Sequence, residues 1–590
     1  MTSQTPRFYQ FGEFRLDAEG RRLLKQNQEI SLTPKAFDTL LELVKLKGRV
    51  LDREELMRKV WPNSFVEEGN IKVTIFNLRK ALEDNPAEMR LIQTVPRHGY
   101  RFAAEVVEID DMAEAELGLN SEKQTTDAEI KSLAVLPLKV IGGVADEYLG
   151  LGLADALIIK LSGVKDIVIR PTSAVRKYVD LDEGALNIAR HLQVEAVLEG
   201  HIYRAGDRVR VTIQLISAID GRTLWADKFD EWFIDIFDVE DSISEQVAQA
   251  LMLELSGTDR RRLTKRYTEN IEAYQLYLKG RYHWAKRLSQ GTRIAAEQFR
   301  AAIDLDPNYT LAYAGLADCY AQLAWLTLMA PSDTLPVAKA AAERALELDP
   351  LLAEAHASLA WIHLIYDLDY SRSEAAFRRS LELNPNYSVA RMWFGVLHIA
   401  TERFSEAIEE LNIALSLDPL SPIINALVGW PFYFMREYEP AIELFKKAIE
   451  LEPRSLPAHY LLGTTYLQTG SLKEAINEMR TARDLDDSSL MTLGLAQAYA
   501  VSDAPVQVKQ LMNELSRSVI EKGKYVSPYD EAGLYLRLGD YDRAINKLED
   551  AFSDRSAWRI FLPVDPKFDV LRGDERFVKL LQGMGKRAAA

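Results

Sequence analysis

The spacing of apolar positions changes along the chain and divides it into three stretches. In about the first hundred residues, short alternating runs flank segments in which apolar residues recur every three or four positions. Alternation predicts half-buried strands, whereas the longer spacing predicts amphipathic helices. From 131 to about 256 strand-like and helical runs alternate, and from 270 onward the helical spacing dominates. Because 590 residues exceed what one core holds, the pattern predicts a multidomain protein.

The first stretch predicts strands, then three helices, then a hairpin. The strand-like pieces read FGEFRLD, RLLKQ and QEISLT, and Thr33 is suited to begin the first helix. The second helix is expected to start at Asp52. The third covers about 70–83 and has a buried stripe of Ile71, Ile75, Leu78 and Leu82. The segment TVPRHGYRF, residues 94–102, is expected to close the unit as a hairpin.

Charge changes this picture, because it is unevenly distributed. The chain has 72 Lys and Arg against 88 Asp and Glu, a net charge of -16. Residues 1–105 nevertheless hold 18 basic against 15 acidic residues, and three of their basic or titratable side chains surround the hairpin tip. Only this segment is suited to meet a polyanion.

These elements make a winged helix-turn-helix, an α+β fold. Residues 7–105 resemble the OmpR/PhoB-type winged-helix domain of bacterial transcription regulators, a family associated with phosphorelay signal transduction. The resemblance rests on LTPKAFDTLLELVKLKGRVLDREELMRKVWP, on NLRKAL in the third helix and on GYRF in the hairpin. A helix fits the major groove, where polar side chains meet base edges and flanking cations meet phosphates. The resemblance therefore implies double-stranded DNA as a partner.

The resemblance also implies which side chains contact DNA. The exposed face of the third helix is expected to read bases, while its neighbours and the wing hold phosphates or reach the minor groove. The residues are Asn70, Lys72, Thr74 and Asn77 on the third helix; Trp61, Arg79 and Lys80 for the backbone; and Arg97, His98 and Arg101 on a wing braced by Tyr100. Many relatives carry arginines just before LRK, where this chain has Phe76-Asn77, so the preferred base sequence stays open. The alternative for each cation is an ordinary solvated position.

The segment 106–130 is acidic and has no apolar periodicity, which is typical of a flexible linker. After it, residues 131–258 predict an α/β domain. This part resembles the TolB amino-terminal-like domain through LAVLPL, LGLGLADALIIKLS and the long run from VLEGHIY to WADKFD. The GLGLAD motif lacks the third glycine of a dinucleotide loop, so packing of a helix on a sheet is favoured over nucleotide binding.

Residues 268–590 repeat themselves. Pro350, Pro385, Pro419, Pro453 and Asp487 recur at intervals of 35, 34, 34 and 34. This signature resembles the tetratricopeptide repeat and predicts an all-α solenoid of paired helices with a C-terminal cap. Small residues are expected where paired helices approach closely.

A solenoid of this kind commonly holds a protein or peptide in its concave groove. The first helices of the repeats are expected to line that groove with Ala426, Trp430, Tyr460 and Thr464. The alternative is that the aromatic residues belong to the core between repeats.

The sequence favours a binding protein over an enzyme. Its eight histidines are dispersed, Cys319 lies in an apolar repeat, and neither a zinc spacing nor a phosphate loop is present, so we expect no metal, cofactor or catalytic residue. The N-terminus lacks a signal peptide pattern, and no stretch is apolar enough to span a membrane. We therefore expect a soluble, cytoplasmic protein.

The sequence predicts a bacterial DNA-binding transcription regulator whose repeats bind a protein partner or mediate self-assembly into a homo-oligomer. Two other classes stay open. One is an assembly scaffold with a vestigial or protein-binding winged helix. The other is a nucleotide-binding enzyme that uses the middle domain.

Overall fold

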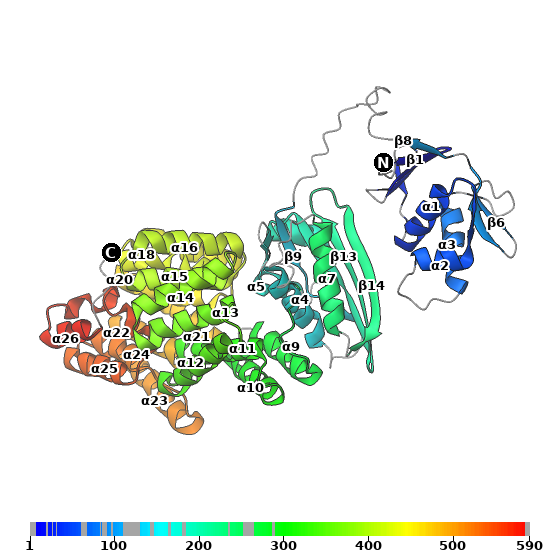
Figure 1. The fold of residues 1–590 in the computed structure, drawn as a ribbon. Coiled ribbons are helices and arrows are strands. Elements are labelled where there is room, and N and C mark those ends of the chain that lie inside the picture. Colours follow the sequence, from blue (N-terminus) through cyan, green and yellow to red (C-terminus); the bar gives the residue numbers. More distant parts are fainter. Residues whose placement is uncertain are drawn as a thin grey trace. The chain divides into compact units, whose positions relative to one another are not determined.

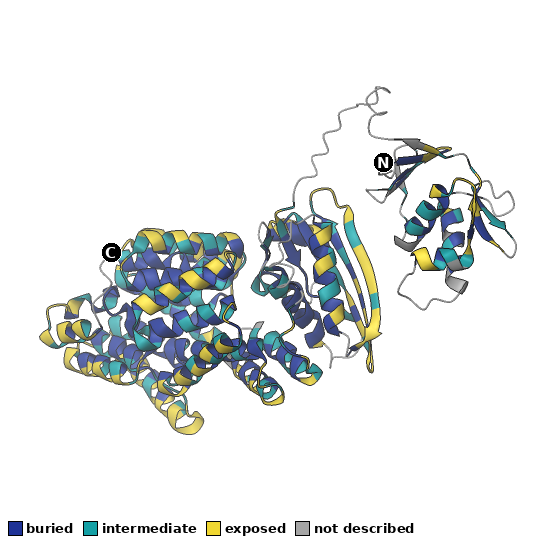
Figure 2. Ribbon diagram, in the orientation of Figure 1, coloured by how far each residue is buried: buried dark blue, intermediate teal, exposed yellow. Residues whose placement is uncertain are grey.

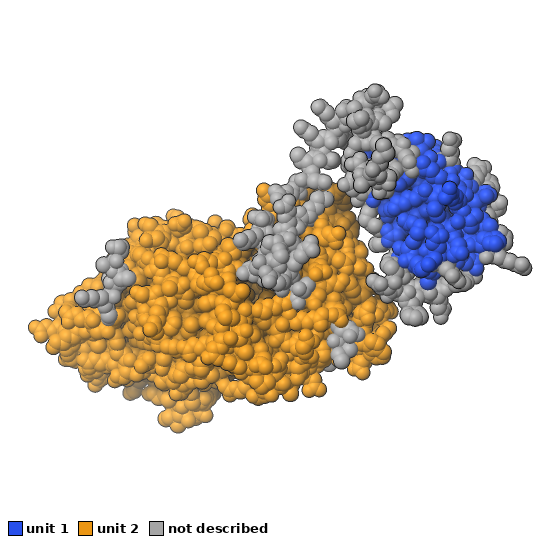
Figure 3. All heavy atoms as spheres, in the orientation of Figure 1, with its two compact units in different colours: residues 1–128 blue, residues 129–590 orange. Residues whose placement is uncertain are grey.

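The computed structural model describes residues 8–584 apart from gaps, and it divides the chain into two compact units, 1–128 and 129–590 (Figure 3). The gaps are 19–21, 26–27, 31, 33, 61–67, 83, 85–90, 96–97, 105, 110–129, 142–146, 163, 165–166, 180–183, 234–235, 252–262, 264 and 286–288.

The first unit is a winged helix-turn-helix with two small sheets. Its strands are β1 (Phe8–Phe11), β2 (Phe14–Asp17), β3 (Arg22–Lys25), β4 (Gln28–Ile30), β5 (Val50–Asp52), β6 (Ile92–Val95), β7 (Gly99–Phe102) and β8 (Val107–Ile109). Its helices are α1 (Pro34–Lys45), α2 (Arg53–Val60) and α3 (Glu68–Ala81). The sheets have the strand orders β4-β3-β2-β1-β8 and β5-β7-β6.

The second helix begins at its predicted cap, whereas α3 begins and ends about two residues earlier than the predicted 70–83. The predicted first cap, Thr33, lies outside the described residues. The side chain of Asp52 accepts a hydrogen bond from the Glu55 backbone N–H at 3.0 Å, which satisfies one of the free donors at the start of α2. Ile71, Ile75 and Leu78 on α3 are all buried and share a core with α1 and the wing. The predicted stripe of the third helix is therefore confirmed.

Two sequence-based boundaries in this unit need correction. The run FGEFRLD is two strands, because Gly12 adopts a positive φ of 55° and the chain turns between Phe11 and Phe14. The predicted linker 106–130 begins within the fold, since β8 pairs with β1 through Phe8 and Ile109. Residues 110–129, the main part of that linker, lie outside the described residues.

The second unit opens with a mixed sheet. Its strands are β9 (Ser132–Val135), β10 (Lys139–Ile141), β11 (Val168–Ile169), β12 (Ala196–Ala205), β13 (Arg208–Ser217) and β14 (Thr223–Trp232). Its helices are α4 (Glu147–Ser162), α5 (Thr172–Val175), η2 (Arg176–Tyr178), α6 (Ala185–Leu192) and α7 (Ile236–Ala250). The strand order is β11-β9-β12-β13-β14, and β10 also pairs with β12. The pairs β11-β9, β9-β12 and β10-β12 are parallel. The pairs β12-β13 and β13-β14 are antiparallel.

The glycines of GLGLAD pack the helix that carries them. A Cβ on Gly150 would collide with the carbonyl oxygen of Leu138, and a Cβ on Gly152 would lie 3.0 Å from Leu278. The two glycines therefore let α4 approach the sheet on one side and the first repeat helix on the other. The predicted packing role of these glycines is confirmed.

The rest of the unit is a solenoid of paired helices, shown in green to red in Figure 1. The pairs are α9 (Ile271–Ala285) with α10 (Ser289–Leu305); α11 (Thr310–Trp325) with α12 (Pro331–Leu348); α13 (Ala353–Ile362) and η4 (His363–Asp367) with α14 (Tyr370–Leu383); α15 (Ser388–Ala400) with α16 (Phe404–Leu417); α17 (Pro422–Leu427) and α18 (Trp430–Met435) with α19 (Tyr438–Leu451); α20 (Leu456–Thr469) with α21 (Leu472–Leu485); α22 (Ser489–Val501) with α23 (Pro505–Lys522); and α24 (Pro528–Arg537) with α25 (Tyr541–Ser553). The chain ends with η5 (Ala557–Phe561), η6 (Pro566–Leu571) and α26 (Glu575–Gly583).

The 34-residue period sets the contacts between paired helices. A Cβ on Gly395 would lie 2.9 Å from Leu411, one on Gly429 2.7 Å from Phe445, and one on Gly463 3.0 Å from Met479. The same position thus holds glycine wherever a large side chain of the second helix fills the space, as predicted. One repeat departs from the pattern, because Pro431 divides its first helix into α17 and α18.

The mixed sheet and the solenoid share a continuous core and belong to one compact unit, although the sequence suggested separate domains. Arg281 of α9 forms an ion pair of 2.7 Å with the buried Asp155 of α4. Arg170 donates hydrogen bonds to the carbonyl oxygens of Ser416 and Leu417, at 2.7 and 2.9 Å. Polar contacts as well as the shared core therefore join the mixed sheet to the repeats.

Candidate nucleic-acid interface

The third helix of the winged unit has one buried and one accessible face. Ile71, Ile75 and Leu78 face the core, while Thr74 is half-buried and Lys80 is exposed. The side chains of Trp61, Asn70, Lys72, Asn77 and Arg97 lie outside the described residues. Of the predicted DNA contacts on the helix, the structure thus places Thr74 and Lys80 where a ligand can reach them.

Arg79 has a structural task that the sequence did not reveal. Its guanidinium donates hydrogen bonds to the carbonyl oxygen of Ile92, at 2.8 and 3.2 Å, and to Oγ1 of Thr94, at 2.9 Å. These bonds tie α3 to β6 of the wing. Since the guanidinium is committed to the wing strand, Arg79 braces the hairpin instead of reaching out to a phosphate.

The wing is held rigidly at its base and is accessible at its tip. Tyr100 is buried and lies in β7 opposite Leu51, so it braces the wing as predicted and is not a surface contact. Gly99 has a φ of 141°, and a Cβ there would collide with the Leu51 carbonyl oxygen. His98 at the turn is exposed, and its backbone N–H donates to the Val95 carbonyl at 3.1 Å.

Arg101 is exposed on the same strand and is oriented by a neighbour. Its Nε and Nη2 atoms donate to Oε1 of Gln93 at 2.9 and 2.7 Å. A planar guanidinium held in this way keeps its remaining N–H groups directed and available. Arg101 and His98 are the described wing side chains that can meet a ligand.

The predicted partner groove of the repeats is filled by the protein's own C-terminal segment. Ala426, Trp430 and Tyr460 are buried, and Oγ1 of the half-buried Thr464 donates to the Tyr460 carbonyl at 2.8 Å. The ring of Trp430 lies 5.7 Å from Trp558 and 4.8 Å from Phe561, both from η5. The prediction of an open groove at these residues is wrong, and the alternative of aromatic core residues is correct.

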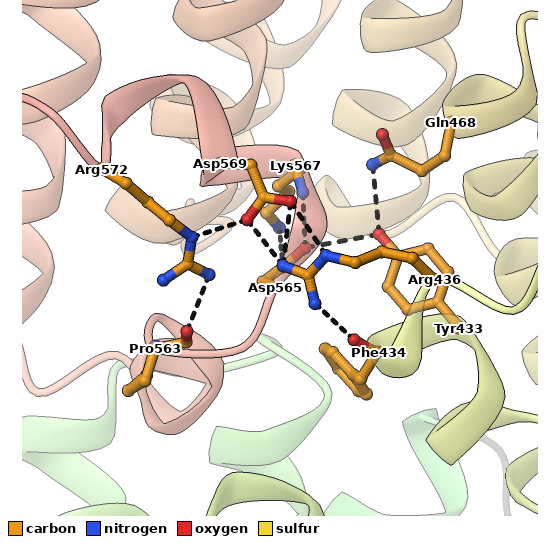
Figure 4. Close-up of polar contacts among 9 residues, drawn as sticks. All are labelled: Tyr433, Phe434, Arg436, Gln468, Pro563, Asp565, Lys567, Asp569 and Arg572. Atoms are coloured by element: carbon orange, nitrogen blue, oxygen red, sulfur yellow. Dashed lines mark hydrogen bonds and ion pairs between the residues drawn. The ribbon is translucent and has the colours of Figure 1, made fainter. Parts of the chain in front are cut away.

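A second set of contacts holds η6 against the middle repeats (Figure 4). The hydroxyl of Tyr433 donates to one oxygen of Asp565 at 3.3 Å, and Tyr529 donates to the other at 2.9 Å. Arg436 donates three hydrogen bonds to Asp569, at 2.6, 2.9 and 3.0 Å. The terminal segment is thus fixed by buried aromatic contacts on one side and by charged hydrogen bonds on the other.

One buried acid lies between the mixed sheet and the first repeats. Glu240 of α7 is buried beside Lys160, whose Nζ lies 3.6 Å from Oε2, and it lines a cavity of about 40 Å³ together with Tyr274. Burial raises the pKa of Glu240 to about 7, although the Lys160 ammonium opposes the shift.

The described residues show neither a metal-holding cluster nor a reactive thiol. Within those residues, no group of three or more His, Cys, Asp or Glu side chains is arranged to hold a metal ion. Cys319 is buried, and burial raises the pKa of its thiol well above the ordinary value, which disfavours the nucleophilic thiolate. Among the described helices, none combines the length and apolar content needed to cross a bilayer.

Comparison with known families agrees with this geometry. Residues 27–102 match the family model described as "Transcriptional regulatory protein, C terminal". The first unit is an OmpR/PhoB-type winged helix. Behind the winged helix, residues 129–245 match the model "HilA/YgeH-like transcriptional regulator, second domain", and 364–422 and 435–491 match tetratricopeptide repeats. The resemblance of the middle part to the TolB amino-terminal domain stays a prediction.

Individual relatives share several parts of the chain. The "Transcriptional regulator HilA" of Salmonella typhi is 23% identical over 439 residues, 74% of this chain and 75% of its own. The "Putative adenylate cyclase 3" of Rhizobium meliloti is 28% identical over 187 residues, 32% of each chain. Among solved structures, the DNA-binding domain of E. coli CadC is 30% identical and covers 18% of this chain and 100% of its own, with a TM-score of 0.17. The two family models matched at residues 27–102 and 129–245 are both models of transcription regulators.

Proposed function

We propose that the protein regulates transcription by docking α3 of the winged helix into the major groove of duplex DNA, with the wing on the adjoining backbone. The observation that supports this is the division of α3 into a buried stripe and an accessible face beside a braced, cation-bearing hairpin. A helix held by its own core can present side chains to bases without reorganising. The similarity to regulators over most of the chain supports the same function.

The contacts divide into base-reading and phosphate-holding residues. We assign base reading to Lys72, Thr74 and Asn77, as the resemblance implies. Phosphate contacts fall to Lys80, Arg97 and Arg101. Arg79, which was predicted to hold the backbone together with Lys80, is left out because its guanidinium holds the wing. Trp61, Asn70 and His98 complete the proposed contact surface.

A binding titration tests this proposal. Full-length protein should bind genomic duplex fragments with an affinity that falls linearly with salt on logarithmic axes, and Asn77→Ala should change which sequences are preferred. Lys80→Ala should weaken binding to all sequences alike. If the wild-type protein shows no salt-dependent affinity for any duplex, the regulator function is wrong and the scaffold alternative is left.

The role of the repeats also changes with the structure. Because the groove residues are covered by the C-terminal segment, we assign protein partners or self-assembly to the outer surfaces of the solenoid. Two linked winged helices on paired half-sites would bind DNA far more tightly than one. Size-exclusion chromatography with light scattering, with and without duplex DNA, tests whether such assembly occurs.

A further inference from the structure

Part of the mixed sheet in the second unit has an uncovered face. Along β13 the burial alternates strictly from Arg208 to Ile213, with the even positions exposed and the odd positions buried. Helices α4 and α7 pack on the buried side, and α6 packs near the start of β12, where Ala196, Val197 and Leu198 are buried on both faces. The second half of β12, with β10, β13 and β14, therefore leaves one face to solvent. Figure 2 shows the exposed residues along β14 in yellow. We call this surface the open face; it consists of alternate positions of these four strands.

The strand register places cations on both sides of the open face. Lys139 of β10 pairs with His201 of β12, which pairs with Thr212 of β13, which pairs with Lys228 of β14. All four side chains are exposed. Since neighbouring strands lie about 4.8 Å apart, the two lysines end a row about 14 Å long.

The neighbouring rows add two arginines and two exposed aromatic rings. Arg210 pairs with Tyr203 on one side and with Asp230 on the other, and Arg208 pairs with Trp232. Tyr203 is 44% and Trp232 is 52% exposed. The Arg208 guanidinium lies over the Trp232 ring, 4.9 Å from its centre.

Charge on the open face is opposite to that of the chain. Among its described strand positions, four Lys and Arg stand against the acids Asp230 and Glu199, in a protein with a net charge of -16. Asp230 is shared by Arg210, at 2.5 Å, and Arg208, at 3.7 Å. Asp227 and Glu231, at odd positions of β14, pair with the buried Ile213 and Val209 and so point to the other side of the sheet. The open face thus carries two more basic than acidic side chains at these strand positions, four against two.

We propose that the open face is a second nucleic-acid-binding surface, which takes the phosphodiester backbone. Cations spread over a flat sheet match a polyanion, and the release of its counterions drives binding. Exposed aromatic rings between cations are the feature that lets a sheet stack on unpaired bases, so a single strand gains contacts there that a duplex does not. This surface lies in the second unit and acts in addition to the winged helix.

The test uses full-length protein, fluorescence anisotropy and salt titration with two probes, a 60-base-pair duplex and a 30-nucleotide single strand. The face variant is Arg208→Glu with Lys228→Glu. The matched control is Lys446→Glu with Lys447→Glu, two exposed lysines of α19 that give the same change in net charge. Each lost phosphate contact lowers the slope of log affinity against log salt by about 0.9 for duplex and about 0.7 for single strands. The slope of the face variant should therefore fall by the amount expected for about two lost phosphate contacts, whereas the control should retain the wild-type slope.

Three outcomes are informative. A reduced salt slope in the face variant, but not in the control, supports the proposal. If Tyr203→Ala or Trp232→Ala lowers the affinity for the single strand but not for the duplex, unpaired bases are the preferred ligand of the open face. Equal slopes in wild type, face variant and control overturn the proposal while leaving the winged helix intact, because the wild type still binds duplex. If the Lys80→Ala variant binds duplex more weakly but binds the single strand as the wild type does, the winged helix and the open face are separate binding surfaces. If the open face instead bound an acidic protein, the face variant would leave both nucleic-acid slopes unchanged, which counts against the proposal.

Discussion

The indole of Trp558 stacks on that of Trp325 with ring centres 5.1 Å apart, and its Nε1 donates a hydrogen bond of 2.9 Å to the Trp325 carbonyl oxygen. The two residues belong to the C-terminal segment and to the second helix pair of the solenoid. Their contact closes the concave side of the repeats with the protein's own chain. The groove that repeat proteins commonly offer to partners is here part of the hydrophobic core.

Trp558→Ala should therefore destabilise the second unit strongly. Removing a packed indole leaves a cavity among aromatic rings and should lower the free energy of unfolding by roughly 3 kcal/mol. Thermal or denaturant unfolding followed by tryptophan fluorescence and circular dichroism measures the change. Trp232→Ala is the matched control, since that ring is 52% exposed and should change stability little. Equal effects of the two substitutions would show that the terminal segment is not part of the core.

Two ion pairs of the second unit, one buried and one exposed, should differ in their contribution to the free energy of unfolding. Arg281 pairs with the buried Asp155, so Arg281→Met leaves a carboxylate in the core and should cost roughly 3 kcal/mol. Arg436 pairs with Asp569, and both side chains are more than a third exposed, so Arg436→Met should cost less than about 1 kcal/mol. Urea unfolding of both variants under the same conditions compares the two costs. A larger loss for Arg436→Met would mean that the terminal segment depends on this pair more than on its aromatic contacts.

Glu240 should make the second unit less stable as pH rises towards neutrality. Its pKa is raised from 4.5 to about 7 in the folded protein, so between these values the folded state holds a proton that the unfolded chain has released. Stability therefore falls through this window, by up to roughly 3 kcal/mol for a shift of this size, and is flat on either side. The neighbouring charges that face Glu240 are Lys160, Asp241 and Arg266.

Comparison with Glu240→Gln isolates this contribution. The difference between the two unfolding free energies, measured from pH 4 to 8, should decline between about 4.5 and 7. His398, whose pKa burial lowers to about 4, acts in the opposite direction in part of this range, but it is present in both proteins and cancels. A difference that does not vary with pH would show that Glu240 is not protonated in the folded state.

Arg79 and Lys80 are adjacent but should respond differently to substitution. Arg79→Ala removes hydrogen bonds from a charged donor to the wing and should destabilise the first unit by roughly 2 kcal/mol. Lys80→Ala should leave stability unchanged and reduce the salt dependence of duplex binding by about 0.9 in slope. Calorimetry and anisotropy titrations separate the two effects. If Arg79→Ala left the stability unchanged and reduced the salt slope of duplex binding, Arg79 would be a phosphate contact and not a brace of the wing.

The sequence by itself determined the local elements, because each depends on nearby residues. The stripe from Ile71 to Leu82 specified α3, and the 34-residue period placed Gly395, Gly429 and Gly463 at helix crossings. The cap formed by Asp52 is likewise local, so the start of α2 and the winged helix as a whole were recognisable from residue types and spacing.

Only the tertiary structure decided which surfaces are free. The residue type and repeat position of Trp430 do not reveal whether a partner or the chain's own Phe561 covers its ring. The spacing of residues along the sequence predicts local structure, but not a contact between segments so far apart. The sequence likewise does not distinguish Arg79 from the adjacent Lys80. Lys80 is exposed, whereas the guanidinium of Arg79 donates a hydrogen bond to the Ile92 carbonyl oxygen. Side-chain periodicity fixes the face on which a residue lies, whereas what lies opposite that face depends on how distant elements pack.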